Sequence, residues 1–395
     1  MGGSLRILLV GTRVLPVRHQ GDKNFWLDVI HRLQAQGHQV DIVSVTADAT
    51  VPASDLPIHH VRPIPVYLDR AGSRFNAEHD FLTGSSNYAS KSVTLPRLLR
   101  AVRDRRLAFR PDVIHFMDNY GPAMLAVRGA TGGVPATVSA PTYHRNRALY
   151  DLFLRLSLSG FDTVVPFSEA FSRRLGELGV PAERTRVIRW GVDTDRFVPP
   201  PEEERREAKR SLGFEEDAFV VLWTGFTQQS GLPELRFALE TATEALGDVK
   251  TRVRFAFCFK AEHYRQEFAA YERPGLKVLG TPAGFASATT AADLLLSPLL
   301  DSRSTAAPPL VWVEAMARGI PLVTNAIPGA EEAAVPGTSG TLVRTPAEAR
   351  KAIDELSGAG ATHSNLRSGA RRLAMERFGI GRAVSEHLAL WKTAS

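Results

Sequence analysis

Short apolar runs alternate along the first half of the chain with segments whose apolar residues recur at helical spacing. Residues 6–11 form an apolar run of strand length, and residues 23–36 place their apolar side chains on one face of a predicted helix. Gly37 ends this helical pattern. Further strands are predicted at residues 39–45, 112–115, 136–139 and 163–166. Such alternation is typical of a doubly wound parallel sheet.

A second alternating series follows a proline-rich stretch. Residues 198–204 read Val-Pro-Pro-Pro-Glu-Glu-Glu, and prolines together with like charges disfavour packing. We therefore predict one α/β domain over residues 1–197 and a second over residues 198–380, with a hinge near residues 197–204. Strands of the second domain are predicted at 219–223, 252–259, 277–279, 293–297 and 321–324, and helices at 233–246 and 309–318. Because doubly wound sheets bind ligands at the carboxyl ends of their strands, we expect a cleft between the domains.

The composition is that of a globular protein. The chain has 395 residues, of which 44% are hydrophobic and 23% charged, and this length favours two domains over a single core. Its net charge of +6 is compatible with anionic ligands such as phosphates. A single cysteine, Cys258, excludes an intrachain disulfide and fits a reducing compartment. Since no apolar stretch has the features of a membrane span or a secretory signal, we expect a cytoplasmic protein.

Two motifs resemble those of a known family. Residues 187–197 read Val-Ile-Arg-Trp-Gly-Val-Asp-Thr-Asp-Arg-Phe, close to the family element N-G-V-D-x-x-x-F, with Trp190 in place of the asparagine. Residues 314–323 read Glu-Ala-Met-Ala-Arg-Gly-Ile-Pro-Leu-Val, close to E-A-M-A-x-G-x-P-V-V. Together with Gly-His at 37–38 and Pro-Asp-Val-Ile-His at 111–115, these motifs make the chain resemble the retaining GT-B glycosyltransferases of the glycogen-synthase-like, family-4-like type.

The resemblance implies a GT-B fold, in which two Rossmann-like domains face a central cleft. The N-terminal domain would bind the acceptor and the C-terminal domain the donor, and a C-terminal helix, residues 381–395, would pack back on the N-terminal domain. The implied reaction moves a hexosyl group from a UDP- or GDP-linked sugar to a small-molecule, glycan or lipid-linked acceptor, with retention of the anomeric configuration. Such enzymes need no cofactor and no metal, and this sequence has neither metal-ligand spacing nor a nucleic-acid motif.

Glu314 is the sharpest candidate in the second domain. The resemblance implies that its carboxylate accepts hydrogen bonds from the ribose hydroxyls of the donor, with Val311 also at the donor site. The alternative is a carboxylate that stabilises its own helix. The preceding glutamate of the family pattern E-x7-E would fall on Ala306. Asp301 is its counterpart if an insertion lies within residues 302–309; otherwise Asp301 is a solvated loop residue.

The donor-phosphate segment departs from the family pattern. Family members place an arginine and a lysine on the diphosphate, whereas residues 224–231 here read Thr-Gly-Phe-Thr-Gln-Gln-Ser-Gly. Phe226 stands for the arginine and Ser230 for the lysine. The Gly225 backbone and the polar groups of Gln229 and Ser230 remain available to bind phosphate, aided by the dipole of the helix that follows.

Other donor-site candidates follow predicted strand ends. Lys260 comes directly after one strand and Arg303 lies in the proposed insertion, so each either replaces a missing cation or is solvated. Leu279 and Gly280, at the end of another strand, are assigned to donor binding through the resemblance.

Candidates in the first domain also cluster after strands. Gly21 lies where the family uses a glycine for close backbone approach, and Asp22 and Lys23 beside it are either acceptor contacts or helix-start residues. By resemblance, His144 would hydrogen-bond the transferring sugar; the alternative is a loop histidine with no role. Asp118 falls at a strand carboxyl end and joins these catalytic candidates.

Two features of the sequence have alternative interpretations. Residues Arg97 to Arg106 predict a basic amphipathic helix, which is either a weak contact for acidic membranes or a solvated helix face. The missing arginine and lysine leave two rivals to a nucleotide-sugar transferase. One is an enzyme with an unusual donor, such as a non-nucleotide sugar phosphate, and the other is a catalytically silent GT-B protein that binds a sugar or a partner. Retention of Glu314 favours the nucleotide donor.

Overall fold

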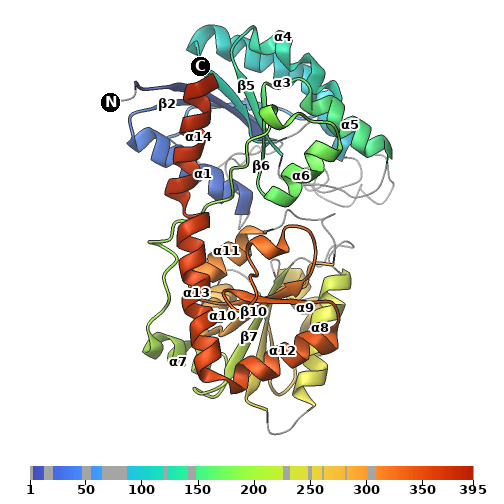
Figure 1. The fold of residues 1–395 in the computed structure, drawn as a ribbon, viewed down its shortest axis with the longest axis vertical. Coiled ribbons are helices and arrows are strands. Elements are labelled where there is room, and N and C mark those ends of the chain that lie inside the picture. The colour runs from blue at the N-terminus through green and yellow to red at the C-terminus, as the bar shows by residue number, and fades with distance from the viewer. Residues whose placement is uncertain are drawn as a thin grey trace. The chain divides into compact units, whose positions relative to one another are not determined.

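The structure, a computed structural model, describes residues 3–12, 21–46, 55–64, 87–118, 122–140, 148–225, 232–247, 251–259, 262–280, 283–300 and 308–394. The chain divides into two compact units. Unit 1 comprises Met1–Trp190 with Ile380–Ser395, and unit 2 comprises Gly191–Gly379. Each unit contains one parallel sheet accompanied by helices (Figure 1).

Unit 1 is built on a six-stranded parallel sheet in the order β3-β2-β1-β4-β5-β6. Its strands are β1 (Arg6–Thr12), β2 (Gln39–Val45), β3 (Ile58–Val61), β4 (Val113–Phe116), β5 (Ala136–Ala140) and β6 (Thr163–Pro166). Its helices are α1 (Gly21–Ala35), α3 (Asn87–Phe109), α4 (Val127–Thr131), α5 (Ala148–Leu158), α6 (Glu169–Glu177) and α14 (Ile380–Ala394), with 3-10 turns η2 (Pro122–Ala126) and η3 (Ala182–Arg184). The residues of central β1 from Ile7 to Val10 are fully buried, as expected for a parallel strand covered on both faces.

Helix α14 packs into unit 1 through a buried cluster of aromatic and histidine side chains. The indole N–H of Trp391 donates to Thr137 Oγ1 at 3.3 Å. The His387 ring lies 5.4 Å from Trp26 and 5.5 Å from His115, measured between ring centroids. Burial lowers the pKa of His387 to about 4 and holds the pKa of His115 well below its usual range, so both rings are neutral at pH 7.

Unit 2 repeats the architecture with a parallel sheet in the order β12-β11-β10-β7-β8-β9. Its strands are β7 (Phe219–Gly225), β8 (Val253–Phe259), β9 (Leu276–Gly280), β10 (Leu294–Leu296), β11 (Leu322–Asn325) and β12 (Gly340–Val343). Its helices are α7 (Glu202–Ser211), α8 (Leu232–Leu246), α9 (Glu262–Phe268), α10 (Ala283–Ala291), α11 (Leu310–Ala317), α12 (Pro346–Gly358) and α13 (Gly360–Phe378), with turns η4 (Ala269–Tyr271) and η5 (Ala330–Glu332).

The sheet of unit 2 separates two hydrophobic clusters. Successive side chains of a strand point to opposite faces, so β7 contributes to both clusters. Val220 and Leu222 pack with residues of α7, α10, α11 and α13. Val221 and Trp223 pack with residues of α8 and α12. Helices therefore cover both faces of this sheet, as the run of apolar residues in β7 predicts.

The predicted fold class, two α/β domains with doubly wound sheets, is confirmed. The contacts divide the chain between Trp190 and Gly191, earlier than the boundary predicted after residue 197. The Val192 N–H donates to the Phe378 carbonyl at 2.8 Å, so the segment before the prolines already belongs to unit 2. At the other end of the chain, α14 belongs to unit 1 and contacts α1.

Several elements had no counterpart in the sequence prediction. Strand β3 reads Ile-His-His-Val, and its two histidines, His59 and His60, interrupt any apolar run. Strand β12 is four residues long and begins at Gly340. Helices α7, α12 and α13 are mostly polar on their outer faces.

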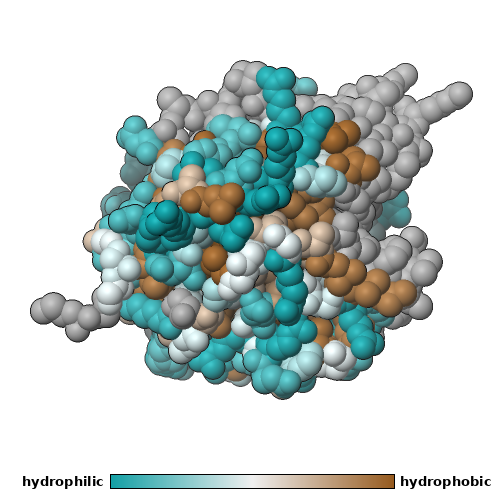
Figure 2. Space-filling model, turned by 90° about the horizontal axis from the view of Figure 1, so that it is seen from above, coloured by the Kyte–Doolittle hydropathy of each residue, from teal (hydrophilic) through white to brown (hydrophobic). Residues whose placement is uncertain are grey.

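The basic segment from Arg97 to Arg106 lies in α3, whose apolar side chains Leu98 and Val102 are buried in the core. Arg105 donates to Asp41 Oδ2 from Nε at 2.8 Å and from Nη2 at 2.6 Å. These contacts favour the interpretation that the basic side chains form a solvated helix face, and they do not favour a contact with membranes. In the described part of the chain, the helices are all too short or too polar to cross a membrane. Figure 2 shows hydrophobic residues in small groups among hydrophilic ones on the face that it views.

Candidate functional site

Three predicted donor-site residues lie at the carboxyl edge of the sheet in unit 2. The last residues of β7, β8 and β9 are in register, because Gly225 pairs with Phe259 and Phe259 pairs with Gly280. A Cβ atom at Gly225 would lie 2.7 Å from Cζ2 of Trp223, so a side chain there requires the indole ring to move. Leu279 and Gly280 are half-buried at the same edge. The sheet thus brings Gly225, Leu279 and Gly280 to one edge.

Helix α11 carries the remaining described donor candidates. It follows β10, and a helix that follows a parallel strand begins at the carboxyl edge of the sheet. Val311, Glu314 and Arg318 are half-buried and share one face by their spacing, whereas Trp312 and Val313 are buried. Glu314 lies in the second turn of α11, and the first turn has no acidic residue. Because a helix dipole acts mainly within the first turn, this position disfavours the alternative that Glu314 serves to stabilise the N-terminus of its own helix.

One hydrogen bond fixes α11 to the end of β10, and a second joins the segment after β10 to the end of β11. The indole N–H of Trp312 donates to Ser297 Oγ at 2.7 Å, and the Leu299 N–H donates to Asn325 Oδ1 at 3.1 Å. Ser297 follows β10, and Asn325 ends β11. Sequence reasoning did not single out these residues. The available signal was a tryptophan in an otherwise apolar helix, since a buried indole N–H needs a hydrogen-bond acceptor.

Positive charge lies beside the Glu314 face of α11. The Arg318 Cζ atom is 5.6 Å and the Arg196 Cζ atom 5.1 Å from the centroid of the Phe197 ring. Burial lowers the pKa of Arg318, while the charge of Glu314 acts in the opposite direction. An arginine remains protonated under ordinary conditions, so Arg318 presents a cation one helical turn after Glu314.

Several predicted site residues lie outside the described residues. They are His144, Phe226, Gln229, Ser230, Lys260, Asp301 and Arg303. In the sequence, the segment 226–231 joins β7 to α8, Lys260 follows β8, and the segment 301–307 joins β10 to α11. Their roles stay predictions.

In unit 1, Asp118 joins the ends of two strands to the start of a helix. Asp118, after β4, accepts the Thr12 N–H at 2.6 Å through Oδ2, and the same oxygen lies 3.7 Å from Lys23 Nζ. The side chains of Lys23 and Asp118 are 6% and 15% exposed. Helix α1 begins at Gly21, so Gly21, Asp22 and Lys23 share its first turn. The contacts of Asp118 favour a positioning role, and its role in catalysis stays a prediction.

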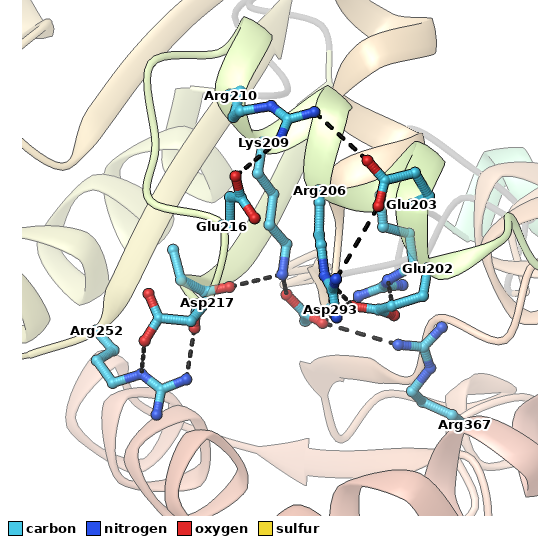
Figure 3. Close-up of polar contacts among 12 residues, drawn as sticks. Glu202, Glu203, Arg206, Lys209, Arg210, Glu216, Asp217, Arg252, Asp293 and Arg367 are labelled. Carbon is cyan, nitrogen blue, oxygen red and sulfur yellow. Dashed lines mark hydrogen bonds and ion pairs between the residues drawn. The ribbon is translucent and has the colours of Figure 1, made fainter.

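A buried charge cluster lies at the opposite, amino edge of the sheet in unit 2 (Figure 3). Asp293, just before β10, accepts the Val220 N–H at 2.9 Å and pairs with Arg205, with Lys209 at 3.0 Å and with Arg367 at 3.8 Å. One carboxylate therefore ties α7 and α13 to the sheet. In the described ranges, no three His, Cys, Asp or Glu side chains are grouped so as to hold a metal ion.

Comparison with known proteins gives two family matches. Residues 23–191 match the family described as "Glycosyl transferase 4-like domain", and residues 219–358 match "Glycosyl transferases group 1". A D-inositol 3-phosphate glycosyltransferase of Geodermatophilus obscurus is 31% identical over 247 residues, which cover 55% of this chain and 49% of the relative. The chain therefore spans about half the length of the curated relatives that it matches.

Solved structures share the fold at low identity. Sucrose-phosphate synthase from Thermosynechococcus elongatus has a TM-score of 0.73 and 17% identity, with 98% of each chain covered. The Anabaena protein HepE in complex with UDP and glucose has a TM-score of 0.68 and 17% identity, with 98% of this chain and 100% of that chain covered. At these identities the likeness establishes the fold, that is, the arrangement of helices and strands, and shows nothing about the ligands of this chain.

Proposed function

Because the chain belongs to the GT-B glycosyltransferases that combine a 4-like N-terminal domain with a group 1 C-terminal domain, we propose that it transfers a hexosyl group from a nucleotide sugar. The donor is UDP- or GDP-linked, and HepE, which has the same fold, binds UDP. The acceptor is a small molecule, a glycan or a lipid-linked sugar. The single cysteine, Cys258, is buried and the chain has no second cysteine for an intrachain disulfide, which suits the cytoplasm as the place of the reaction.

The observation that carries this proposal is the position of Glu314. Its half-buried carboxylate lies on the same face of α11 as Val311, and α11 begins at the edge of the sheet where Gly225 and Gly280 lie. A carboxylate accepts hydrogen bonds from two vicinal hydroxyls at once, as a ribose presents them. Gly225 has no Cβ that would keep a phosphate from the backbone at the end of β7.

The chemistry we propose retains the anomeric configuration without an enzymic nucleophile. The bond between the anomeric carbon and the phosphate oxygen breaks, and the acceptor oxygen bonds to that carbon on the same face. The departing phosphate takes the acceptor's proton. The protein holds both substrates in reacting geometry and stabilises the charge that grows on the diphosphate, and no metal enters the scheme.

The charge on the diphosphate needs a partner, because Phe226 and Ser230 replace the usual cations. We propose that Lys260, which follows β8, or Arg303, which precedes α11, supplies it. Replacing the responsible residue by alanine lowers the transfer rate by at least about tenfold, equivalent to about 1.4 kcal/mol of transition-state stabilisation. Intact turnover in both single variants contradicts this assignment.

A thermal-shift titration with UDP, GDP and their sugar conjugates tests the function directly. A ligand present at about 100 times its dissociation constant raises the free energy of unfolding by about 2.7 kcal/mol. A shift with one nucleotide, lost in Glu314→Ala, supports the proposal. If no nucleotide shifts the transition of the wild type, the proposal fails in favour of an unusual donor or a silent protein.

A further inference from the structure

Arg371, on α13, binds three backbone carbonyls that belong to two other parts of unit 2. Its Nη1 donates to the Ala317 carbonyl at 2.7 Å and to the Phe197 carbonyl at 2.6 Å. Its Nη2 donates to the Thr194 carbonyl at 2.9 Å. Ala317 is the last residue of α11, so Arg371 holds the end of the helix that carries Glu314.

The carbonyl of Ala317 needs an external donor. The last carbonyls of a helix have no partner within the helix, and a charged donor satisfies them strongly. A planar guanidinium suits three carbonyls in different directions, because its five N–H groups form a fixed fork. Arg371 thus gives α11 a fixed end, while the Trp312 bond to Ser297 fixes its beginning.

The same guanidinium also places the residues beside Glu314. By binding the carbonyls of Thr194 and Phe197, it fixes the turn whose Phe197 ring lies against Arg318 and Arg196. Arg318 shares the half-buried face of α11 with Glu314. One side chain therefore holds both the helix and the aromatic ring that supports its last turn.

We propose that Arg371 is a positioning residue for nucleotide binding, which acts by holding α11 so that the Glu314 carboxylate meets the ribose of the donor. This inference rests on the proposed function. The Arg371 guanidinium donates to the backbone carbonyls of Ala317, Phe197 and Thr194, so the role we assign to it acts through α11 and needs no contact with the donor. Loss of Arg371 leaves the chemistry of Glu314 intact and removes only its fixed position.

Arg367 provides a matched control one helical turn earlier on α13. It pairs with Asp293 at 3.8 Å in the charge cluster at the amino edge of the sheet (Figure 3). Both arginines anchor α13, yet only Arg371 has hydrogen bonds to the end of α11. Like Arg371→Met, the variant Arg367→Met removes one positive charge and one contact of α13. Unlike Arg371→Met, it leaves the hydrogen bond to the end of α11 in place.

The experiment compares the wild type, Arg371→Met, Arg371→Lys and Arg367→Met by titration with UDP and with GDP. We expect Arg371→Met to raise the dissociation constant of the bound nucleotide at least about fivefold, because small displacements of binding groups have large effects. We expect Arg371→Lys to recover part of the affinity. The dissociation constant of Arg367→Met should stay within about twofold of the wild-type value, even if its melting temperature falls as much as that of Arg371→Met. Equal nucleotide affinity in Arg371→Met and wild type overturns the inference.

Amide hydrogen exchange across residues 310–317 gives a readout that needs no nucleotide. We expect faster exchange of α11 in Arg371→Met than in Arg367→Met, since only the first variant frees the end of the helix. Unchanged exchange contradicts the positioning role even if no nucleotide binds. Wild-type protein that binds neither UDP nor GDP, with α11 loosened in Arg371→Met, refutes the proposed function and retains Arg371 as the anchor of α11.

Discussion

Acid is expected to destabilise unit 1 through His387, which packs helix α14 against the sheet. Its Nδ1 lies 2.8 Å from the Ala383 carbonyl, and its Nε2 has no hydrogen-bond partner among the described residues. The rings of Trp26, His115 and Trp391 surround it. A protonated imidazole in this position would carry a buried, unpaired charge, which is costly.

The size of the effect follows from the pKa of His387, about 4 in the folded protein against an ordinary value of 6.5. Below pH 6.5 the unfolded chain binds a proton at this site and the folded chain does not, so folding stability falls as the pH falls. The loss is complete near the folded pKa of about 4 and amounts to about 3 kcal/mol. His115, whose pKa is also held well below its usual range by burial and by His387, adds a loss in the same direction.

The assay is urea unfolding between pH 8 and pH 4.5, followed by tryptophan fluorescence. The variant His387→Phe keeps an aromatic ring in this position and removes the titrating group. Its free energy of unfolding should therefore fall much less than that of the wild type as the pH is lowered. His31→Gln, at an exposed position of α1, serves as the control and should follow the wild type. If the wild type and His387→Phe lose stability in parallel, His387 is not the group responsible.

Three further predictions address other sites. Glu314→Ala is expected to weaken binding of a nucleoside diphosphate by about 1–3 kcal/mol in calorimetry with little change in folding, and a large stability loss at unchanged affinity would assign Glu314 to structure. Asp293→Ala leaves Arg205 and Lys209 as buried charges without their carboxylate, so urea unfolding should show a loss of about 3–5 kcal/mol, and a loss below about 1 kcal/mol contradicts the cluster's role. Asp118→Asn keeps an oxygen for the Thr12 N–H and removes the charge opposite Lys23, so thermal unfolding should shift down by the equivalent of about 1 kcal/mol while nucleotide affinity in unit 2 stays unchanged.

Elements with strong apolar runs could be predicted from the sequence, and weakly patterned ones could not. Strand β6 was predicted at the residues where it lies, and β7 was predicted to within two residues at its end. Strand β3 could not be predicted, because His59 and His60 remove the apolar signal and the strand is held by pairing with β2. Local pattern thus predicts a strand where its own residues are buried, and fails where a neighbour's pairing supplies the stability.

The candidate site could be predicted only as far as its motifs extend. Glu314 and Gly225 stand in short recognisable segments, whereas the partners of Arg371 are up to 177 residues away in sequence. Trp190 shows the same limit. It replaces an asparagine of the motif, and in the structure its ring stacks on Phe167 at 3.7 Å between ring centroids. The local sequence pattern does not predict this contact. Long-range contacts of this kind depend on the whole topology.

The discontinuous make-up of unit 1 has a consequence for biosynthesis. Unit 2 is a single stretch of sequence, Gly191–Gly379, while unit 1 takes its last helix from residues that the ribosome adds afterwards. A nascent chain that has just completed unit 2 still lacks α14, so Trp26 and His115 have not yet met His387 and Trp391. The contacts of α14 with the sheet of unit 1 therefore form only after unit 2 has been synthesised, and until then the apolar surface that α14 covers is exposed to solvent and to chaperones.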